Sequence, residues 1–222
     1  MYPLIKRFLD VFIALIATIL LIPLFVTLII ILKLTGEKEI FFLQKRVGFK
    51  NKHFYIFKFS TMLKDSANMK GGAVTTKKDP RITSLGHFLR RSKINELPQF
   101  LNILNGDMSF IGPRPVMLES FAAYPRNTKN IIYNSRPGLS GIGSIVMSDE
   151  EKLLTRIKDD GGDAWEFYKI YIFPYKCEVE TWYNNNISFM IDIKIILLTL
   201  VIIFSPQTRI DCFFKGLPKR NF

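Results

Sequence analysis

The longest apolar pattern in the chain is an uncharged run of 22 residues from Val11 to Leu32. At about 1.5 Å per residue, a helix of this length can cross a hydrocarbon layer of roughly 30 Å, so the run predicts a membrane helix. Pro23 lies near its middle and lacks the N–H that a helix interior needs. Lysine or arginine flanks both ends, and a re-entrant hairpin would keep both flanks on the inner side. Residues 1–35 are therefore expected to form a hairpin broken at Pro23 or a kinked span.

The remaining residues, 36–222, show a mixture of short patterns rather than regular strand-helix alternation. The aromatic, alternating run His53–Phe59 predicts a strand, and Ile142–Met147 predicts a second, short one. Two helices and one long polar loop are expected. The aromatic segment 168–183 does not favour one type of secondary structure over another. The expected helices are Leu85–Arg91 and Glu96–Asn105, the latter with Asn95 as its N-cap, and the loop is Lys64–Ser84. The predicted class is α+β, dominated by helices.

A second apolar stretch, Ile187 to Phe204, is interrupted by Asp192 and Lys194. The uncharged part that remains is too short to cross a membrane. The stretch predicts a C-terminal helix that lies in the membrane interface or packs on the core.

Composition narrows the class of partner. Lys and Arg number 31 against 19 Asp and Glu, a net charge of +12, while 48% of the residues are hydrophobic. The chain is too apolar for a disordered basic tail, and its partners should be anionic: phosphates, anionic membrane lipids or, less favoured, nucleic acid. Two distant cysteines, Cys177 and Cys212, exclude a disulfide scaffold and a zinc module. No P-loop, GxGxxG, GxSxG or HExxH motif occurs.

Candidate chemistry comes from guanidinium groups near turns and from a few carboxylates. Arginine forks suit bidentate contact with phosphate oxygens, and a lysine adds a point charge. The cationic candidates are Arg90, Arg91, Arg114, Arg136 and Lys58, and Pro113 with the next proline fixes the direction of Arg114. Glu96 and Asp107 are candidate ligands for a Mg²⁺ that would bridge to phosphate. Each of these residues can also be an ordinary surface charge, a helix-dipole residue or a turn residue.

The string LRRSKINELPQFLNILNGDMSFIGPRP at residues 89–115 resembles the bacterial sugar transferase family, the monotopic phosphoglycosyl transferases. The similarity continues in order through QKRVG (44–48), FYIFKFSTM (54–62), DPRIT (79–83), RPGLSGI (136–142) and NISFMIDIKI (186–195). Several long motifs in a fixed order make this a strong signal.

The resemblance implies transfer of a phospho-sugar from a UDP-sugar to polyprenol phosphate, with release of UMP. It also implies a re-entrant membrane helix broken at Pro23 and a catalytic domain on the cytoplasmic face of the bacterial inner membrane. The matching positions imply catalytic roles for Asn95, Glu96, Arg90 and Arg114, and a Mg²⁺ held by Glu96.

The chain departs from the family at the nucleophile. The family has Asp-Glu before Leu-Pro-Gln, where this chain has Asn95-Glu96. In the family the aspartate forms a covalent phospho-sugar enzyme, but a carboxamide offers no anionic oxygen for that step. Three explanations remain open: the chain is an inactive relative that binds a partner, another carboxylate substitutes, or the two substrates react directly.

Overall fold

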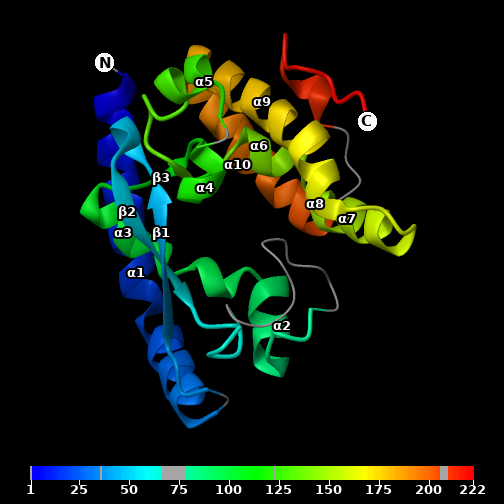
Figure 1. The fold of residues 1–222 in the computed structure, drawn as a ribbon. Helices are drawn as coiled ribbons and strands as arrows, with labels where there is room; N and C mark the ends of the chain where they lie inside the picture. The colour runs from blue at the N-terminus through cyan, green and yellow to red at the C-terminus, as the bar shows by residue number, and fades with distance from the viewer. Residues whose placement is uncertain (1, 36, 67–78, 123, 206–209) are drawn as a thin grey trace.

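The computed structural model describes residues 2–35, 37–66, 79–122, 124–205 and 210–222 (Figure 1). Helices dominate, and the strands form two small sheets, which confirms the predicted α+β class. In chain order the elements are α1 (Tyr2–Leu34), β1 (Phe41–Val47), η1 (Phe49–Asn51), β2 (His53–Phe59), α2 (Ser84–Arg91), η2 (Ile94–Glu96), α3 (Gln99–Asn105), β3 (Ser109–Ile111), α4 (Leu118–Ala122), α5 (Arg126–Ile131), β4 (Gly138–Ser140), α6 (Ile142–Val146), α7 (Glu150–Asp159), α8 (Ala164–Phe167), η3 (Tyr168–Ile172), α9 (Phe173–Asn185), α10 (Phe189–Phe204) and η4 (Asp211–Phe213).

Helix α1 runs without a break through Pro23, so the expected hairpin is not confirmed. A proline removes one backbone donor, and a long apolar helix tolerates this loss when the rest of its hydrogen-bond ladder is kept. Two hydroxyls also bond back to the helix: Thr18 Oγ1 donates to the Ala14 carbonyl at 2.7 Å and Thr27 Oγ1 to the Pro23 carbonyl at 2.9 Å. Among the described residues, α1 is the helix that is long and apolar enough to cross a membrane, judged by length and composition.

Both halves of α1 pack on the rest of the chain. Ala14 lies in an apolar cluster with Ile56 and Ile103, and Leu28 lies in another with Phe59 and Leu89. The opposite face of the helix is exposed along most of its length. In Figure 1 the domain accordingly lies along one side of this blue helix. One face of α1 therefore belongs to the core, and the other is free to contact lipid.

The two sheets position the loops that carry charge. Strands β1 and β2 pair antiparallel from Phe41 opposite Phe59 to Val47 opposite His53, and β2 has the predicted bounds. Strands β3 and β4 pair in parallel. After β3, the chain at Gly112 passes so close to the chain before β4 that a Cβ there would lie 2.2 Å from the Arg136 carbonyl oxygen. Glycine is required at this position, and the turn that follows it carries Arg114.

The predicted C-terminal helix is confirmed as α10, which Ser188 caps by accepting a hydrogen bond from the Ile191 N–H. One face of α10, with Ile195 and Leu198, is buried in the largest apolar cluster. Its other face, which includes Leu197 and Ile203, is exposed.

Two predictions of local structure are wrong. Residues 142–146 form helix α6 instead of a strand, because Ile142 and Ile145 are three apart and both turn into the core against α9 and α10. The helix expected from Glu96 is divided into the short η2 and α3, so Asn95 lies inside a 3-10 turn and caps nothing. Lys93, at φ 60°, and Pro98 mark the two bends.

The remaining predictions concern one helix, one ambiguous segment and one loop. The helix over 85–91 is confirmed as α2, and the ambiguous segment 168–183 is helical, with a π-helical turn at η3 followed by α9. Of the long loop predicted over 64–84, residues 67–78 lie outside the described residues.

Candidate active site

Three distant segments bring their charged side chains together around Glu96. Glu96 ends η2, Lys58 lies in β2, and Arg114 lies in the turn after β3. Lys58 Nζ is 2.8 Å from Glu96 Oε1, and Arg114 Nη2 is 3.6 Å from the same oxygen. Sequence analysis nominated all three residues, and the fold places them in one cluster.

The electrostatics keep Glu96 ionised. Burial alone would raise the pKa of this carboxyl group, but Lys58 and Arg114 outweigh that effect and lower its pKa to about 2. Burial lowers the pKa of Lys58, with Glu96 opposing the shift, while Glu96 raises the pKa of Arg114. The cluster is therefore a carboxylate held between two cations.

A pocket beside this cluster carries a third cation that sequence analysis missed. Its lining residues are Arg46, Ile56, Lys58, Gln99, Arg114, Pro115, Gly138 and Leu139. Arg46 comes from β1 and donates from Nη1 to the Pro115 carbonyl at 3.4 Å. Burial and the neighbouring Arg114 lower its pKa to about 10, which leaves it protonated near neutral pH. The QKRVG motif contained the signal, but nothing in the sequence showed that its arginine faces Lys58 and Arg114.

Three cations against one carboxylate leave the pocket with an excess of positive charge. Arg46 Nε is buried and has no hydrogen-bond partner within the described part of the chain. Buried donors without a partner are costly, and a phosphate oxygen would satisfy them. The arrangement favours an anionic ligand, and a phosphate is one group whose charge suits it.

Asn95, next to Glu96, is buried, and its Oδ1 finds no hydrogen-bond partner among the residues that the structure describes. Gln99, one helical turn further on, is buried as well and has an unpartnered Nε2 within the same described residues. Two amides with free hydrogen-bonding capacity can orient a polar ligand. Neither can supply an anionic nucleophile.

Glu180 holds the turn that carries Arg114 through a backbone hydrogen bond, and the sequence did not indicate this role. This buried side chain of α9 accepts a hydrogen bond from the Arg114 backbone N–H at 3.3 Å. Burial raises its pKa to about 7. Its sequence context, an ordinary helix of mixed character, gave no indication of this contact.

The remaining nominated residues lie outside the Glu96 cluster. Arg90 donates from Nε to Thr61 Oγ1 at 2.8 Å, and Arg91 on the same helix is exposed. Arg136 donates to the Gly106 carbonyl at 2.8 Å and stacks over Phe49. The Pro113 carbonyl accepts from the Gly138 N–H at 2.9 Å, which fixes the turn before Arg114.

Asp107 is not brought to Glu96. The two carboxylates lie beyond opposite ends of α3, whose seven residues measure about 10 Å at 1.5 Å per residue. No cluster of three His, Cys, Asp or Glu side chains occurs among the described residues. Mg²⁺ is often held in proteins by one or two carboxylates together with substrate phosphates, and an ionised Glu96 beside a cationic pocket fits that mode.

The fold and the pocket together define an α+β domain with a cationic pocket, carried on an apolar helix. The chain belongs to the bacterial sugar transferase family, whose sequence profile matches residues 1–206.

Similar proteins share most of this chain. A UDP-N-acetylgalactosamine-undecaprenyl-phosphate N-acetylgalactosaminephosphotransferase of Aeromonas hydrophila is 33% identical over 90% of this chain, which spans 43% of that protein. The exopolysaccharide production protein ExoY of Sinorhizobium fredii is 35% identical over 70% of this chain and 74% of its own length. An undecaprenyl-phosphate glucose phosphotransferase of Komagataeibacter xylinus is 31% identical over 88% of this chain, which spans 35% of that protein.

Proposed function

We propose that the protein is a phosphoglycosyl transferase that moves a sugar phosphate from a UDP-sugar to polyprenol phosphate. In the reaction, an oxygen of the lipid phosphate forms a bond to the β-phosphorus of the donor. The bond from that phosphorus to the bridging oxygen breaks, and its electron pair leaves with UMP. The product is a polyprenyl diphosphate sugar, the first lipid-linked intermediate of a bacterial glycan.

The observation that carries the proposal is the cationic pocket beside an ionised glutamate. Arg46, Lys58 and Arg114 line one small pocket, so their positive charges would face a diphosphate bound at its mouth. Phosphoryl transfer depends mainly on positioning and charge stabilisation. Glu96 would hold Mg²⁺ with the donor phosphates, and the ion would stabilise charge on the phosphate oxygens.

Membrane attachment is the second part of the proposal. Both halves of α1 contact the same domain, while the opposite apolar face is exposed. This supports an α1 that turns its exposed apolar face toward the lipid while its other face stays packed on the domain. We place the domain on the cytoplasmic face of the inner membrane, where a UDP-sugar and anionic headgroups are available and the +12 charge is favourable.

The proposal takes Asn95 to act as a ligand-orienting amide while the lipid phosphate attacks the donor directly. A buried amide oxygen without a partner in the described structure supports an orienting role, and its lack of charge argues against a nucleophilic one. The lipid phosphate is itself an anionic oxygen nucleophile, so loss of a protein carboxylate leaves the chemistry possible.

UMP release in detergent or nanodiscs tests the activity, with a panel of UDP-sugars, undecaprenyl phosphate and Mg²⁺. We expect turnover with at least one donor and none without the lipid or the metal. Absence of UMP with every donor would overturn the proposal. Intact-mass measurement after incubation with donor alone distinguishes the routes, because direct transfer leaves no adduct and a substitute carboxylate leaves a phospho-sugar on the protein.

A catalytically impaired relative, which binds the donor or a partner enzyme, is the second candidate, and the amide at position 95 favours it. Asn95→Asp separates the two candidates. The proposed transferase turns over with the natural asparagine, whereas activity that appears only in Asn95→Asp would assign the natural chain to the binding form. Asn105→Asp, at the end of α3, is the matched control for adding one carboxylate nearby.

A further inference from the structure

A second concave region lies between the N-terminal half of α1 and α10, at the β3–β4 pair. It encloses about 390 Å³, within the range of about 300–1,000 Å³ that is typical of ligand sites. Apolar side chains dominate its walls: Leu9 and Ile13 from α1, Ile196 and Leu200 from α10, and Phe110 and Leu139 from the two strands. We refer to this region as the α1–α10 groove.

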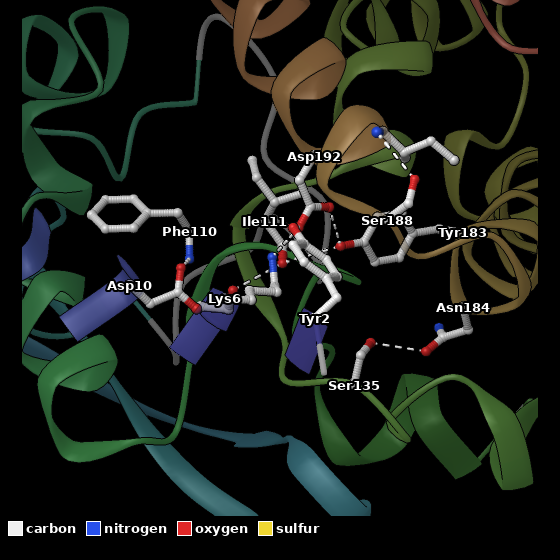
Figure 2. A network of polar contacts seen from close by, with 12 residues as sticks. Tyr2, Lys6, Asp10, Phe110, Ile111, Ser135, Tyr183, Asn184, Ser188 and Asp192 are labelled. Carbon is white, nitrogen blue, oxygen red and sulfur yellow. Dashed lines mark hydrogen bonds and ion pairs between the residues drawn. The ribbon is translucent and has the colours of Figure 1, made fainter. Parts of the chain in front are cut away.

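The polar groups in the groove are already paired within the protein, as Figure 2 shows for the carboxylates. Asp192 accepts hydrogen bonds from Tyr2, Lys6 and Tyr183. Asp10 accepts from the Phe110 N–H at 3.2 Å. The hydroxyls of Ser140 and Thr199 lie 2.9 Å apart and share a hydrogen bond. With these groups satisfied, the surface left for a ligand is hydrocarbon.

The groove adjoins the phosphate pocket through one residue. Leu139, the middle residue of β4, lines both, while its neighbour Gly138 lines the pocket and Ser140 lines the groove. A ligand that rests across Leu139 would therefore place an anionic group among Arg46, Lys58 and Arg114 and a hydrocarbon chain between α1 and α10. A cationic pocket beside an apolar groove is complementary to a phosphate that carries a hydrocarbon chain.

The groove also opens onto the apolar surface of the molecule. Ile13 is 48% exposed and Leu200 is 52% exposed, and both belong to the exposed faces of α1 and α10. A lipid embedded in the bilayer could reach the groove from the side without its chain crossing water. The volume accommodates only the part of a long chain nearest the phosphate.

We propose that the α1–α10 groove binds the first isoprene units of the polyprenyl phosphate acceptor and so aims its phosphate at the pocket. The inference rests on the proposed transferase function for the identity of the acceptor. It predicts that the protein discriminates acceptors by the chain close to the phosphate.

A bulky substitution in the groove tests whether the groove binds the acceptor chain, and the same substitution at a neighbouring position of α10 is the control. Ile196→Trp narrows the groove, whereas Leu197→Trp adds the same bulk one residue away on an exposed surface that does not line it. With undecaprenyl phosphate in nanodiscs, we expect KM to rise about tenfold or more in Ile196→Trp, the effect of losing a few apolar contacts. With methyl phosphate, which has no isoprene unit to occupy the groove, and in Leu197→Trp with either acceptor, KM should stay within about twofold of the wild-type value. An unchanged KM for undecaprenyl phosphate in Ile196→Trp would overturn the proposal, and so would an equal rise for both acceptors.

Photocrosslinking gives a readout that does not depend on turnover. The wild-type protein in nanodiscs is irradiated with an undecaprenyl phosphate analogue whose first isoprene unit carries a benzophenone, and the adduct is mapped by mass spectrometry. We expect adducts on groove residues that undecaprenyl phosphate competes away and phosphatidylglycerol does not. Adducts confined to the outer face of α1, or competition by phosphatidylglycerol, would overturn the groove. Groove adducts in a protein that releases no UMP would leave the groove intact and reject the transferase function.

Discussion

The molecule contains two clusters of largely buried charge that have opposite balances. In the pocket, Arg46, Lys58 and Arg114 face one carboxylate, Glu96, so positive charge is in excess. At the junction of α1 and α10, Lys6 and Asp192 form an ion pair, and the hydroxyls of Tyr2 and Tyr183 satisfy the same carboxylate.

The difference indicates which cluster needs a ligand. A buried ion pair with its hydrogen bonds complete requires nothing from outside and fixes two elements relative to each other. In the pocket, three cations share one carboxylate, and the remaining positive charge favours an anionic ligand. We therefore expect the junction to act as a structural clamp and the pocket to be the binding site. Removing one residue from each cluster should produce different kinds of damage.

The largest expected effect is on stability at the junction. Asp192→Ala leaves Lys6 without its partner and breaks the link between the first and last long helices, which should cost about 3–5 kcal/mol. Thermal or denaturant unfolding in detergent measures this loss. Lys194→Ala, an exposed position two residues along α10, is the control and should cost little. Equal costs for the two variants would contradict the clamp.

A comparable effect on activity, with less effect on the fold, is expected in the pocket. Glu96→Gln removes the proposed Mg²⁺ ligand and the counter-charge of Lys58, and UMP release should fall by about 10²–10³-fold. Glu39→Gln is the matched control, because Glu39 pairs with Lys64 at the surface. Activity of Glu96→Gln close to that of Glu39→Gln would remove Glu96 from the site.

The pH dependence of stability separates two buried glutamates, because the fold lowers the pKa of Glu96 and raises the pKa of Glu180. Glu96, with its pKa lowered to about 2, contributes stability above its unfolded pKa of about 4.5 that is lost as pH falls toward 2. Glu180 has its pKa raised to about 7 by burial, so its contribution is present below about 4.5 and is lost as pH rises through 7. Glu180→Gln should remove this loss of stability between about pH 4.5 and 7, which amounts to on the order of 3 kcal/mol of unfolding free energy.

Unfolding measured from pH 4 to 9 checks the Glu180 prediction. The variant should be more stable than the wild type at pH 8 and similar to it at pH 4.5. A wild-type curve that does not decline in this window, or a Gln variant that declines in parallel, would contradict the raised pKa of Glu180.

The smallest effect is expected from an ion pair with no burial. Arg156 in α7 and Asp160, the residue that caps the C-terminus of α7, lie 3.8 Å apart, and both side chains are largely exposed. Arg156→Ala should change the unfolding free energy by no more than about 0.5 kcal/mol. A larger loss would mean that charge alone, rather than burial, makes the junction strong.

Local patterns in the sequence correctly predicted a strand and a long helix. The alternation of His53–Phe59 gave a strand with the observed bounds, and the run to Phe204 gave α10. The strand predicted at residues 142–147 is wrong. A short β-branched run is compatible with a strand or a helix, and packing on α9 and α10 favours the helix. The expected break at Pro23 is also absent from α1, because proline weakens a helix without forcing it to end.

The candidate site divides in the same way. Motifs nominated Lys58, Glu96 and Arg114 because residue type limits chemistry, and the fold brings them together. Arg46 and Glu180 were missed, since each acquires its role from a neighbour more than fifty residues away in sequence. Asp107 and Arg136 were nominated by the same reasoning, yet both lie beyond the far end of α3.

The sequence by itself determined the apolar helix, the basic charge, the family motifs and the amide where a nucleophilic aspartate is expected, because these depend on residue identity and short-range order. Only the tertiary structure decided which cations share a pocket, which carboxylate they neutralise, and that Leu139 lies between the cationic pocket and an apolar groove. Coulomb energies and desolvation depend on distance and burial, and chain folding alone sets these for residues far apart in the sequence.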